Sequence, residues 1–336
     1  MRMNGQITRP PMRLSYSTLG MIHSCPRKYQ GLKLTDIVNL QEITMASSEN
    51  KDALDFGKAF GVGAQHYFVT GNKDAALVEA LKSYNFVETA IKNIGSLVLA
   101  IDSLYIPHGW RVYNIVNRHG IIRPATEVGF KIILNKETGD YYCGYIDLIM
   151  ESPLDNAVFP LDFKHTAVAQ DDLSPLYLNS DQVTGYATIM NQILSDKTAH
   201  DIVYDVTQFK GTPIPTRHIF PYTKTPVDRL DWLISLQLDY EQLLRYHELG
   251  VFPKRGNACF AYNSPCPLFK ICDLPTIQEQ MYQAPVKKED DWDYILYLDD
   301  LIDNAMTEAE SFDTKELQQH FINCAQSPNY IEEVTL

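Results

Sequence analysis

Three short β-rich segments in the middle of the chain constrain its fold more than any other feature. They are residues 126–135 (TEVGFKIILN), 140–151 (DYYCGYIDLIME) and 156–166 (NAVFPLDFKHT), and turn-forming residues bound each of them. The sequence ETGD at 137–140 is typical of a hairpin turn between the first two segments. We therefore expect a sheet that begins with antiparallel strands.

Helical patterns, with apolar residues three and four positions apart, occupy residues 52–71, 73–104, 181–194 and 226–249. Two further β-rich segments, 201–211 and 215–225, lie between the last two of these helices. The order is therefore helices, three strands, a helix, two strands and a helix. This order predicts an α/β or α+β core in which a helix crosses over to further strands.

Length and composition exclude several classes of protein. The chain has 336 residues, which suggests roughly two domains or one enlarged α/β domain. Hydrophobic residues make up 45% and charged residues 21%, which excludes wholesale disorder, collagen and coiled coil. No apolar run reaches the length of about 18 residues that a membrane span needs, and no secretory signal begins the chain.

The negative charge is concentrated near the end of the chain. The net charge is −13, and residues 287–336, with 13 acidic and 3 basic residues, carry −10 of it. Residues 1–286 therefore carry only −3, which leaves room for a phosphate-binding surface. We expect the acidic end to dock a basic partner or to cover the groove of the main body.

Two carboxylates and a lysine lie within the apolar β segments. Asp147 lies in the second segment, and Asp162 and Lys164 lie in the third. Residues two apart in a strand face the same side, so Asp162 and Lys164 project together, and a neighbouring strand could place Asp147 beside them. Because unpaired buried ions are costly, such an oxygen-rich group favours Mg²⁺ or Mn²⁺. The alternative is a structural salt bridge of Asp162 with Lys164, and of Asp147 with an arginine.

Four other polar residues give weaker signals. His66 lies in a helical pattern, where a single histidine is more often a surface or core residue than a ligand. Gln182 and Tyr186 are four residues apart and share one helix face, so they could offer an amide and a hydroxyl to a phosphate or base. Glu127 begins the first β segment and is either a third acid or an exposed residue.

The six cysteines are too dispersed for a disulfide scaffold. Cys259, Cys266 and Cys272 nevertheless lie within 14 residues of one another, and Cys25 lies far earlier in the chain. Four thiolates could bind an iron–sulfur cluster or tetrahedral Zn²⁺. The alternative is four buried free thiols. We assign the two remaining cysteines, Cys143 and Cys324, to packing or chance.

Five sequence elements, in order, resemble the RecB-type branch of the PD-(D/E)XK nuclease superfamily, which includes phage and CRISPR-associated exonucleases. The resemblance covers residues 13–273 and implies a restriction-endonuclease-like α/β core. Such a core has a mixed central sheet flanked by helices, here with a helical insertion and a C-terminal cysteine-cluster region. The elements are RLSYSTLGMIHSCPRKYQ (13–30), FGKAFGVGAQHYF (56–68), the array of Glu127 with GYID (144–147) and LDFK (161–164), QVTGY (182–186), and the last three cysteines of the cluster.

The resemblance also implies a role for each candidate in the nuclease core. Lys164 would position or activate the attacking water and help to neutralise charge on the phosphate. Glu127 would support the site from a second position. The metal ligands would be His66, Asp147, Asp162 and the backbone carbonyl of Phe163.

Further roles concern DNA and the cysteines. By the same resemblance, Gln182 and Tyr186 would help to hold DNA or the catalytic lysine. Arg27 and Lys28, basic residues beside the first motif, are candidates for DNA binding, with solvated surface as the alternative. Similar nucleases bind a [4Fe–4S] cluster through one early and three late cysteines. The corresponding residues are Cys25, Cys259, Cys266 and Cys272, with Zn²⁺ as the alternative ligand.

We therefore expect a Mg²⁺- or Mn²⁺-dependent deoxyribonuclease, foremost an exonuclease of recombination, repair or phage replication. Its place would be the cytoplasm of a bacterial or phage-infected cell. The alternatives are a non-catalytic DNA-binding or scaffold protein that keeps the fold, and a structure-specific endonuclease. The expected partners are DNA and, through the acidic end, a helicase or a recombination or replication protein; no membrane is expected.

Four regions are expected along the chain. They are an N-terminal helical region (1–125), the nuclease core (126–250), a cysteine-cluster region packed on that core (251–285) and an acidic C-terminal tail (286–336).

Overall fold

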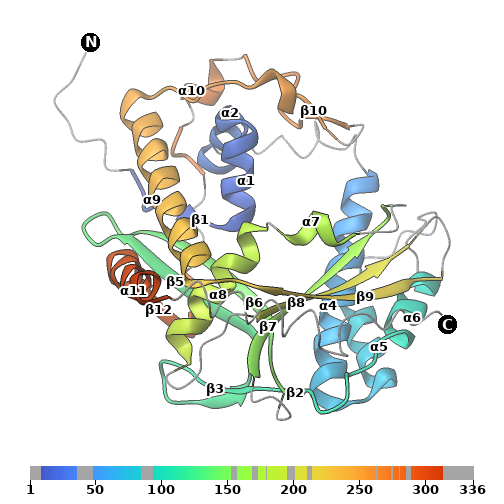
Figure 1. Cartoon of the computed structure of the whole chain (residues 1–336). Helices are drawn as coiled ribbons and strands as arrows, with labels where there is room; N and C mark the ends of the chain where they lie inside the picture. Colours follow the sequence, from blue (N-terminus) through green and yellow to red (C-terminus); the bar gives the residue numbers. More distant parts are fainter. Residues whose placement is uncertain are drawn as a thin grey trace.

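The protein is a mixed α/β structure in which a central mixed sheet is flanked by helices, as expected from the sequence (Figure 1). Within the described part of the chain, no helix is long and apolar enough to cross a membrane. The computed structural model describes residues 9–35, 48–84, 94–152, 157–168, 173–178, 180–194, 201–209, 214–261, 264–273, 275–279, 281–284 and 289–312.

The main path of the sheet has the strand order β12-β5-β6-β7-β8-β9. Strands β5, β6 and β7 are antiparallel to one another, as predicted. Strand β8 then runs parallel to β7, β9 runs antiparallel to β8, and β12 runs parallel to β5. The strands are β5 (Thr126–Asn135), β6 (Asp140–Ser152), β7 (Ala157–Thr166), β8 (Asp201–Gln208), β9 (Thr216–Thr223) and β12 (Tyr294–Tyr297).

Short strands complete the β structure. The turn between β5 and β6 is the predicted one, and Gly139 adopts a φ of 72° there, in the region that favours glycine. Strands β1 (Arg13–Leu14) and β2 (Arg111–Val112) both pair with β6. Two separate small hairpins are formed by β3 (Asn114–Val116) with β4 (Ile122–Pro124) and by β10 (Phe260–Ala261) with β11 (Ser264–Pro265).

One face of the sheet is covered by helices α4 (Ser48–Thr70), α5 (Lys73–Lys82) and α6 (Ile94–Asp102). The single helical pattern predicted over 73–104 thus contains two described helices, while residues 85–93 lie outside the described part. Phe60 and Phe68 of α4 meet the ring of Phe163 edge-to-face, at centroid distances of 6.2 and 5.4 Å. These rings fix α4 over β7, on the sheet face opposite to Asp162 and Lys164.

The other face is covered mainly by α8 and α9, with α11 packed beside α9. A capping box starts α9: the Thr225 hydroxyl accepts from the Asp228 N–H, and the Asp228 carboxylate accepts from the Thr225 N–H. Gly250, at a φ of 63°, ends the same helix. The helices of this layer are α1 (Tyr16–Ser24), α2 (Pro26–Tyr29), a π-helical turn (Gln30–Leu34), α7 (Ser174–Leu178), α8 (Asp181–Ile193), α9 (Pro226–Leu249) and α11 (Leu298–Ser311).

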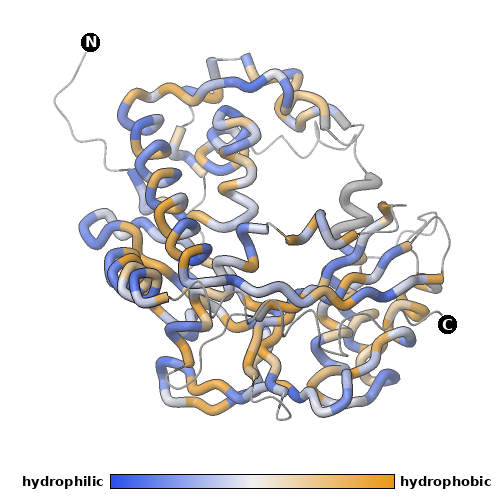
Figure 2. The backbone as a smooth tube through the Cα atoms, in the orientation of Figure 1, coloured by the Kyte–Doolittle hydropathy of each residue, from blue (hydrophilic) through white to orange (hydrophobic). Residues whose placement is uncertain are grey.

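The hydropathy of the backbone follows these layers, with hydrophobic stretches in the central strands and polar residues toward the outside (Figure 2). The two helical layers enclose separate cores. One core joins α4, α5 and α6 to the sheet, and the other joins α1, α8, α9 and α11 to its opposite side. The sheet is therefore buried on both faces, and polar groups within it need partners.

The prediction of an acidic tail is wrong for residues 289–312. This segment supplies β12 to the edge of the sheet and α11 to the helical layer, and Trp292 is fully buried. Its acids meet basic residues of the main body: Asp290 pairs with Arg13 at 2.7 Å, and Asp291 pairs with Arg118 at 2.6 Å. Part of the charge that suggested a docking tail is thus paired with basic residues within the fold. Residues 313–336 lie outside the described part.

The cysteine region (residues 251–285) contacts α2 of the N-terminal region. Its packing on the core at 126–250 stays a prediction. The Arg27 N–H donates to the Pro253 carbonyl at 3.1 Å. Gly31 faces Leu268 so closely that a Cβ at Gly31 would lie 2.4 Å from Leu268 Cδ1, so a larger residue there would force the Leu268 side chain to shift. The region also contains a 3₁₀ turn (Gly256–Ala258) and α10 (Thr276–Glu279).

Candidate active site

Asp147 and Asp162 lie side by side on β6 and β7. The antiparallel register pairs Leu148 with Leu161, so the next residue on each strand, Asp147 and Asp162, comes to an opposed position just past that pair. The Phe163 N–H donates to Asp147 Oδ2 at 3.1 Å, which ties the Asp147 carboxylate to β7. The two strands thus bring together the acids that the sequence singled out.

Lys164 completes this group. Its Nζ lies 2.6 Å from Asp162 Oδ2, on the sheet face that both residues share. The Lys164 side chain is 33% exposed, whereas the Asp162 side chain is 1% exposed. The lysine side chain is therefore partly accessible, whereas the carboxylate is buried.

Helix α8 packs on the sheet face that carries Lys164 and binds the lysine side chain. Lys164 Nζ donates to Gln182 Oε1 at 3.1 Å, and Gln182 Nε2 donates to the Tyr186 hydroxyl at 2.7 Å. That hydroxyl in turn donates to the Tyr145 carbonyl at 2.7 Å. Of the two predicted roles, holding DNA or holding the lysine, the structure shows the second, and Tyr186 itself is buried. Tyr186 orients Gln182, and Gln182 orients the lysine.

The pKa values of all three residues in this group are shifted. Burial, together with the negative charge of Asp162, raises the pKa of Asp147 to about 8, although Lys164 and the Phe163 N–H oppose this. Burial likewise raises the pKa of Asp162, against the influence of Lys164. For Lys164, burial lowers the pKa, but the two carboxylates outweigh it and leave the pKa raised. The lysine is therefore a cation at neutral pH.

Asp162 has no hydrogen bond to either carboxylate oxygen within the described structure, and both oxygens are buried. Its contact with Lys164 is an ion pair without good hydrogen-bond geometry. A buried carboxylate in this condition, beside a second carboxylate that resists ionisation, fits a divalent cation. In the described residues, however, no three His, Cys, Asp or Glu side chains lie close enough to hold a metal ion.

Glu127 lies on β5 in the same row as Asp147. Thr126 pairs with Leu148 and Val128 pairs with Ile146, so Glu127 is opposite Asp147. Glu127 has a φ of 47°, which costs a non-glycine residue about 1–3 kcal/mol. Its charge contributes to the raised pKa of Asp147. Strain of this kind persists only where neighbouring groups enforce it.

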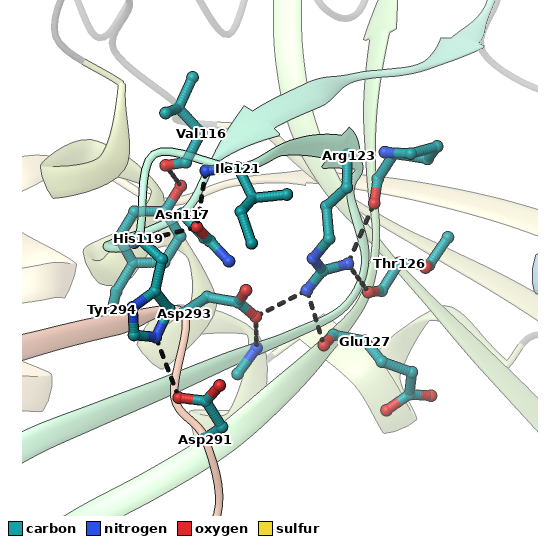
Figure 3. A network of polar contacts seen from close by, with 12 residues as sticks. Val116, Asn117, His119, Ile121, Arg123, Thr126, Glu127, Asp291, Asp293 and Tyr294 are labelled. Atoms are coloured by element: carbon teal, nitrogen blue, oxygen red, sulfur yellow. Dashed lines mark hydrogen bonds and ion pairs between the residues drawn. The ribbon is translucent and has the colours of Figure 1, made fainter.

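Arg123 and the C-terminal segment enforce the strained conformation (Figure 3). The guanidinium of Arg123 donates to the carbonyls of Thr126, at 2.6 Å, and Glu127, at 3.4 Å. Asp293 holds that guanidinium at 2.6 Å and also accepts from the Gly129 N–H at 2.8 Å. The acidic segment thus shapes the strand that carries Glu127.

The structure does not bring His66 to the acid pair. The electrostatic partner that His66 shows is Glu79 of α5, whose pKa it helps to lower after the larger effect of Lys82. The preceding residue, Gln65, instead donates to Glu127 Oε1 at 2.6 Å. Adjacent helical residues point about 100° apart, so Gln65 and His66 meet different neighbours, and within the described chain His66 forms no group of possible metal ligands with the two acids. Gln65 was missed because a single glutamine in a helix gives no signal of its own.

The cysteines gather as a loose group. The pKa of Cys272 is raised, first by burial and further by the thiols of Cys25 and Cys266, while nearby cations lower it. Cys25 and Cys266 therefore each lie near enough to Cys272 to act on its charge, although no three of the described thiols are close enough together to hold a metal ion. Cys259 lies near Cys266, whose N–H donates to the Cys259 carbonyl at 2.8 Å. All four are free in the structure, and Cys324 lies outside the described residues.

Arg27 and Lys28 of α2, the two residues predicted to bind DNA, differ in their surroundings. Arg27 donates to Gln30 Oε1 at 2.6 Å and to the Cys272 carbonyl at 3.3 Å, so its guanidinium binds within the protein. Lys28 is partly exposed on the same short helix. Whether these residues contact DNA stays a prediction.

Comparisons with known proteins place few constraints on this chain. No protein-family model matches it, and no curated protein matches it. A solved structure from Eubacterium rectale, described as a "Putative exonuclease", is similar at 13% sequence identity and a TM-score of 0.38. The match covers 87% of this chain and 96% of that one. This likeness is distant, so the site's own geometry has to support any function.

Proposed function

We propose that this chain is a metal-dependent deoxyribonuclease, an exonuclease that hydrolyses phosphodiester bonds in recombination, repair or phage replication. The observation that supports it is the group of Asp147, Asp162 and Lys164. Two adjoining carboxylates, one without hydrogen bonds, lie beside a cationic lysine on one face of a sheet. Such a group is costly for stability, and function explains why it is kept.

Asp147 and Asp162 would hold Mg²⁺ or Mn²⁺, and the Phe163 carbonyl is the further ligand that the sequence resemblance suggests. When bound, the dication supplies charge neutralisation at the phosphate and a more acidic water. Binding also relieves the repulsion between the two carboxylates, which otherwise raises the pKa of Asp147. The preference of both ions for oxygen ligands agrees with this donor set.

The chain's own residues would do the remaining work. Lys164 stays protonated, so it stabilises negative charge that develops on the phosphate oxygens and orients the attacking water. Gln182 restricts the lysine side chain to one position. Glu127, hydrogen-bonded to Gln65, would support the site from the neighbouring strand, where its charge helps to raise the pKa of Asp147.

Replacing Lys164 by alanine tests this assignment. We expect the rate of hydrolysis of linear DNA in Mg²⁺ or Mn²⁺ to fall about 100-fold or more, because charge stabilisation at the phosphate is lost. EDTA should abolish the wild-type activity. Lys136→Ala removes an exposed lysine in the β5–β6 turn and should leave the rate unchanged.

The substrate form separates the alternatives in the same assay. Hydrolysis of linear but not covalently closed circular DNA agrees with an exonuclease, whereas cleavage of circles identifies an endonuclease. If the wild type binds DNA but shows no metal-dependent hydrolysis, the protein is a binding or scaffold protein. If Lys164→Ala retains the wild-type rate, the proposed site is refuted.

We propose further that Cys25, Cys259, Cys266 and Cys272 bind a [4Fe–4S] cluster, with Zn²⁺ as the alternative. The proposal is supported by the effect of Cys25 and Cys266 on the pKa of Cys272, by the contact of Cys266 with Cys259, and by thiolate chemistry. Protein purified without oxygen should be brown and contain iron, and Cys272→Ser should lose both properties. The matched control is Cys143→Ser, since Cys143 donates to the Leu14 carbonyl on the sheet and should not affect metal content. A colourless wild type with bound zinc would favour Zn²⁺, and metal-free protein would refute both.

A further inference from the structure

Five aromatic rings form a row on the sheet face that carries Lys164. His218, Phe220 and Tyr222 alternate along β9, so their side chains share one face. The His218 and Phe220 rings are stacked at a centroid distance of 5.7 Å, and Phe220 and Tyr222 at 6.5 Å. Tyr177 of α7 stacks on Phe220 at 6.2 Å and lies 4.8 Å from the ring of Tyr204. We call these five residues the aromatic row.

The aromatic row is continuous with the candidate active site. Tyr204 on β8 pairs with Asp162 on one side and with Phe220 on the other. Lys164 Nζ lies 5.9 Å from the centroid of the Tyr204 ring. The charges of Lys164 and Asp162 also reach Tyr177. The row therefore extends from the lysine to β9, the last strand described at that edge of the sheet.

The members of the row differ in burial. Tyr204 and Tyr222 are buried and anchor the row in the core. Tyr177, His218 and Phe220 are only partly buried. Their packing leaves ring area accessible within a short distance of a group suited to phosphate chemistry. None of the five side chains carries a carboxylate that would repel a phosphate.

We propose that the aromatic row binds single-stranded nucleic acid, whose bases stack on Tyr177, His218 and Phe220 while its backbone leads to Asp162 and Lys164. This inference rests on the proposed nuclease function and specifies its substrate. Stacking on protein rings needs bases whose faces are free, which a single strand offers and a paired duplex hides. A nucleic-acid strand that lies along β9 would pass over the Tyr204 ring before its backbone reaches Lys164.

Binding measured in EDTA tests the row without turnover. The probe is a fluorescent oligodeoxythymidine, compared with a blunt duplex of equal length. Phe220→Leu and His218→Ala should each weaken binding of the single strand about 5- to 150-fold, the range for loss of one stacking ring. Duplex binding should stay within about twofold of wild type. Tyr297→Leu, a ring on the opposite edge strand β12, is the matched control and should bind as wild type.

A conservative variant distinguishes stacking from packing. Phe220→Tyr keeps the ring and should retain wild-type affinity, whereas Phe220→Leu should not. The proposal would be overturned if Phe220→Tyr lost as much affinity as Phe220→Leu. It would also be overturned by equal losses of affinity for single strand and duplex, or by no loss of affinity in any variant. Because the readout is binding, these outcomes are distinct from failure of the proposed function, which would appear as no metal-dependent hydrolysis by the wild type.

Discussion

Replacing Asp147 by asparagine is expected to abolish hydrolysis of DNA and, in EDTA at pH 8, to raise the melting temperature. The carboxylate is enclosed beside Asp162, and burial with this like charge raises its pKa to about 8. Asparagine keeps an oxygen for the Phe163 N–H but removes the repulsion. We expect a gain of about 1–3 kcal/mol in the free energy of unfolding, and a loss of about 100-fold or more in rate.

The pH dependence of stability follows from the direction in which folding shifts the pKa of Asp147. Because the folded pKa lies above the usual value of 3.8, the folded state binds more protons than the unfolded state between those two pH values. Wild-type stability therefore falls as the pH rises through this window. The advantage of the asparagine variant should be greatest at pH 8 and above and should vanish near pH 4. Thermal denaturation across this range measures it.

Metal binding provides the control. Mg²⁺ should raise the melting temperature of the wild type, since a ligand stabilises the state that binds it, and should have little effect on Asp147→Asn. The matched substitution Asp303→Asn, at an exposed position on α11, should change neither the stability in EDTA nor the response to Mg²⁺. A variant less stable than wild type in EDTA, or one equally stabilised by Mg²⁺, would contradict the interpretation of Asp147 as a strained metal ligand.

The acid pair could be predicted because strand geometry is local. Alternation along β7 alone places Asp162 and Lys164 on one face, and the two hairpin connections that join β5, β6 and β7 set the antiparallel order. The neighbour of Asp162 on β6 then follows from the register. The prediction that the two acids lie side by side did not depend on where any helix packs, and the structure agrees with it.

The helical contributions could not be predicted in the same way. Which of Gln65 and His66 faces Glu127 depends on how α4 is rotated over the sheet, and large rings such as Phe60 and Phe68 fix that rotation through tertiary packing. Tyr186 shares a helix face with Gln182 as predicted. Its burial, however, depends on the depth at which α8 packs.

Strand β12 was missed for a different reason. It contains four residues, follows a run of acids and pairs in parallel with a strand more than 150 residues earlier. Short parallel pairing has no local sequence signal, and the acidic residues before β12 suggested that this segment is exposed to solvent. Their partners Arg118 and Arg123 are remote in the sequence, so the matching of charge is visible only in the folded chain.

A large loss of stability is expected on substitution of Asp140, a fully buried carboxylate at the start of β6. It accepts hydrogen bonds from Arg9 at 2.5 and 2.6 Å, from the Met12 N–H and the Thr138 hydroxyl at 2.6 Å each, and from the Tyr240 hydroxyl at 2.7 Å. One side chain thus joins the N-terminal segment, the hairpin turn and α9. Asp140→Asn should cost about 3–5 kcal/mol, because it leaves the guanidinium without its charge partner.

The pH dependence of this loss has the opposite sign to that at Asp147. Burial raises the pKa of Asp140, but the hydrogen bonds from Arg9 and the other donors outweigh it and hold the pKa below its usual value. The stabilisation is therefore complete above the unfolded pKa and disappears as the pH falls through the folded one. Denaturant unfolding should show the Asp140→Asn variant converging on wild type in acid. Asp291→Asn breaks an exposed ion pair with Arg118 and should unfold as wild type does at every pH. If Asp140→Asn were no less stable than this control at neutral pH, Asp140 would not be the link between the N-terminal segment and the sheet.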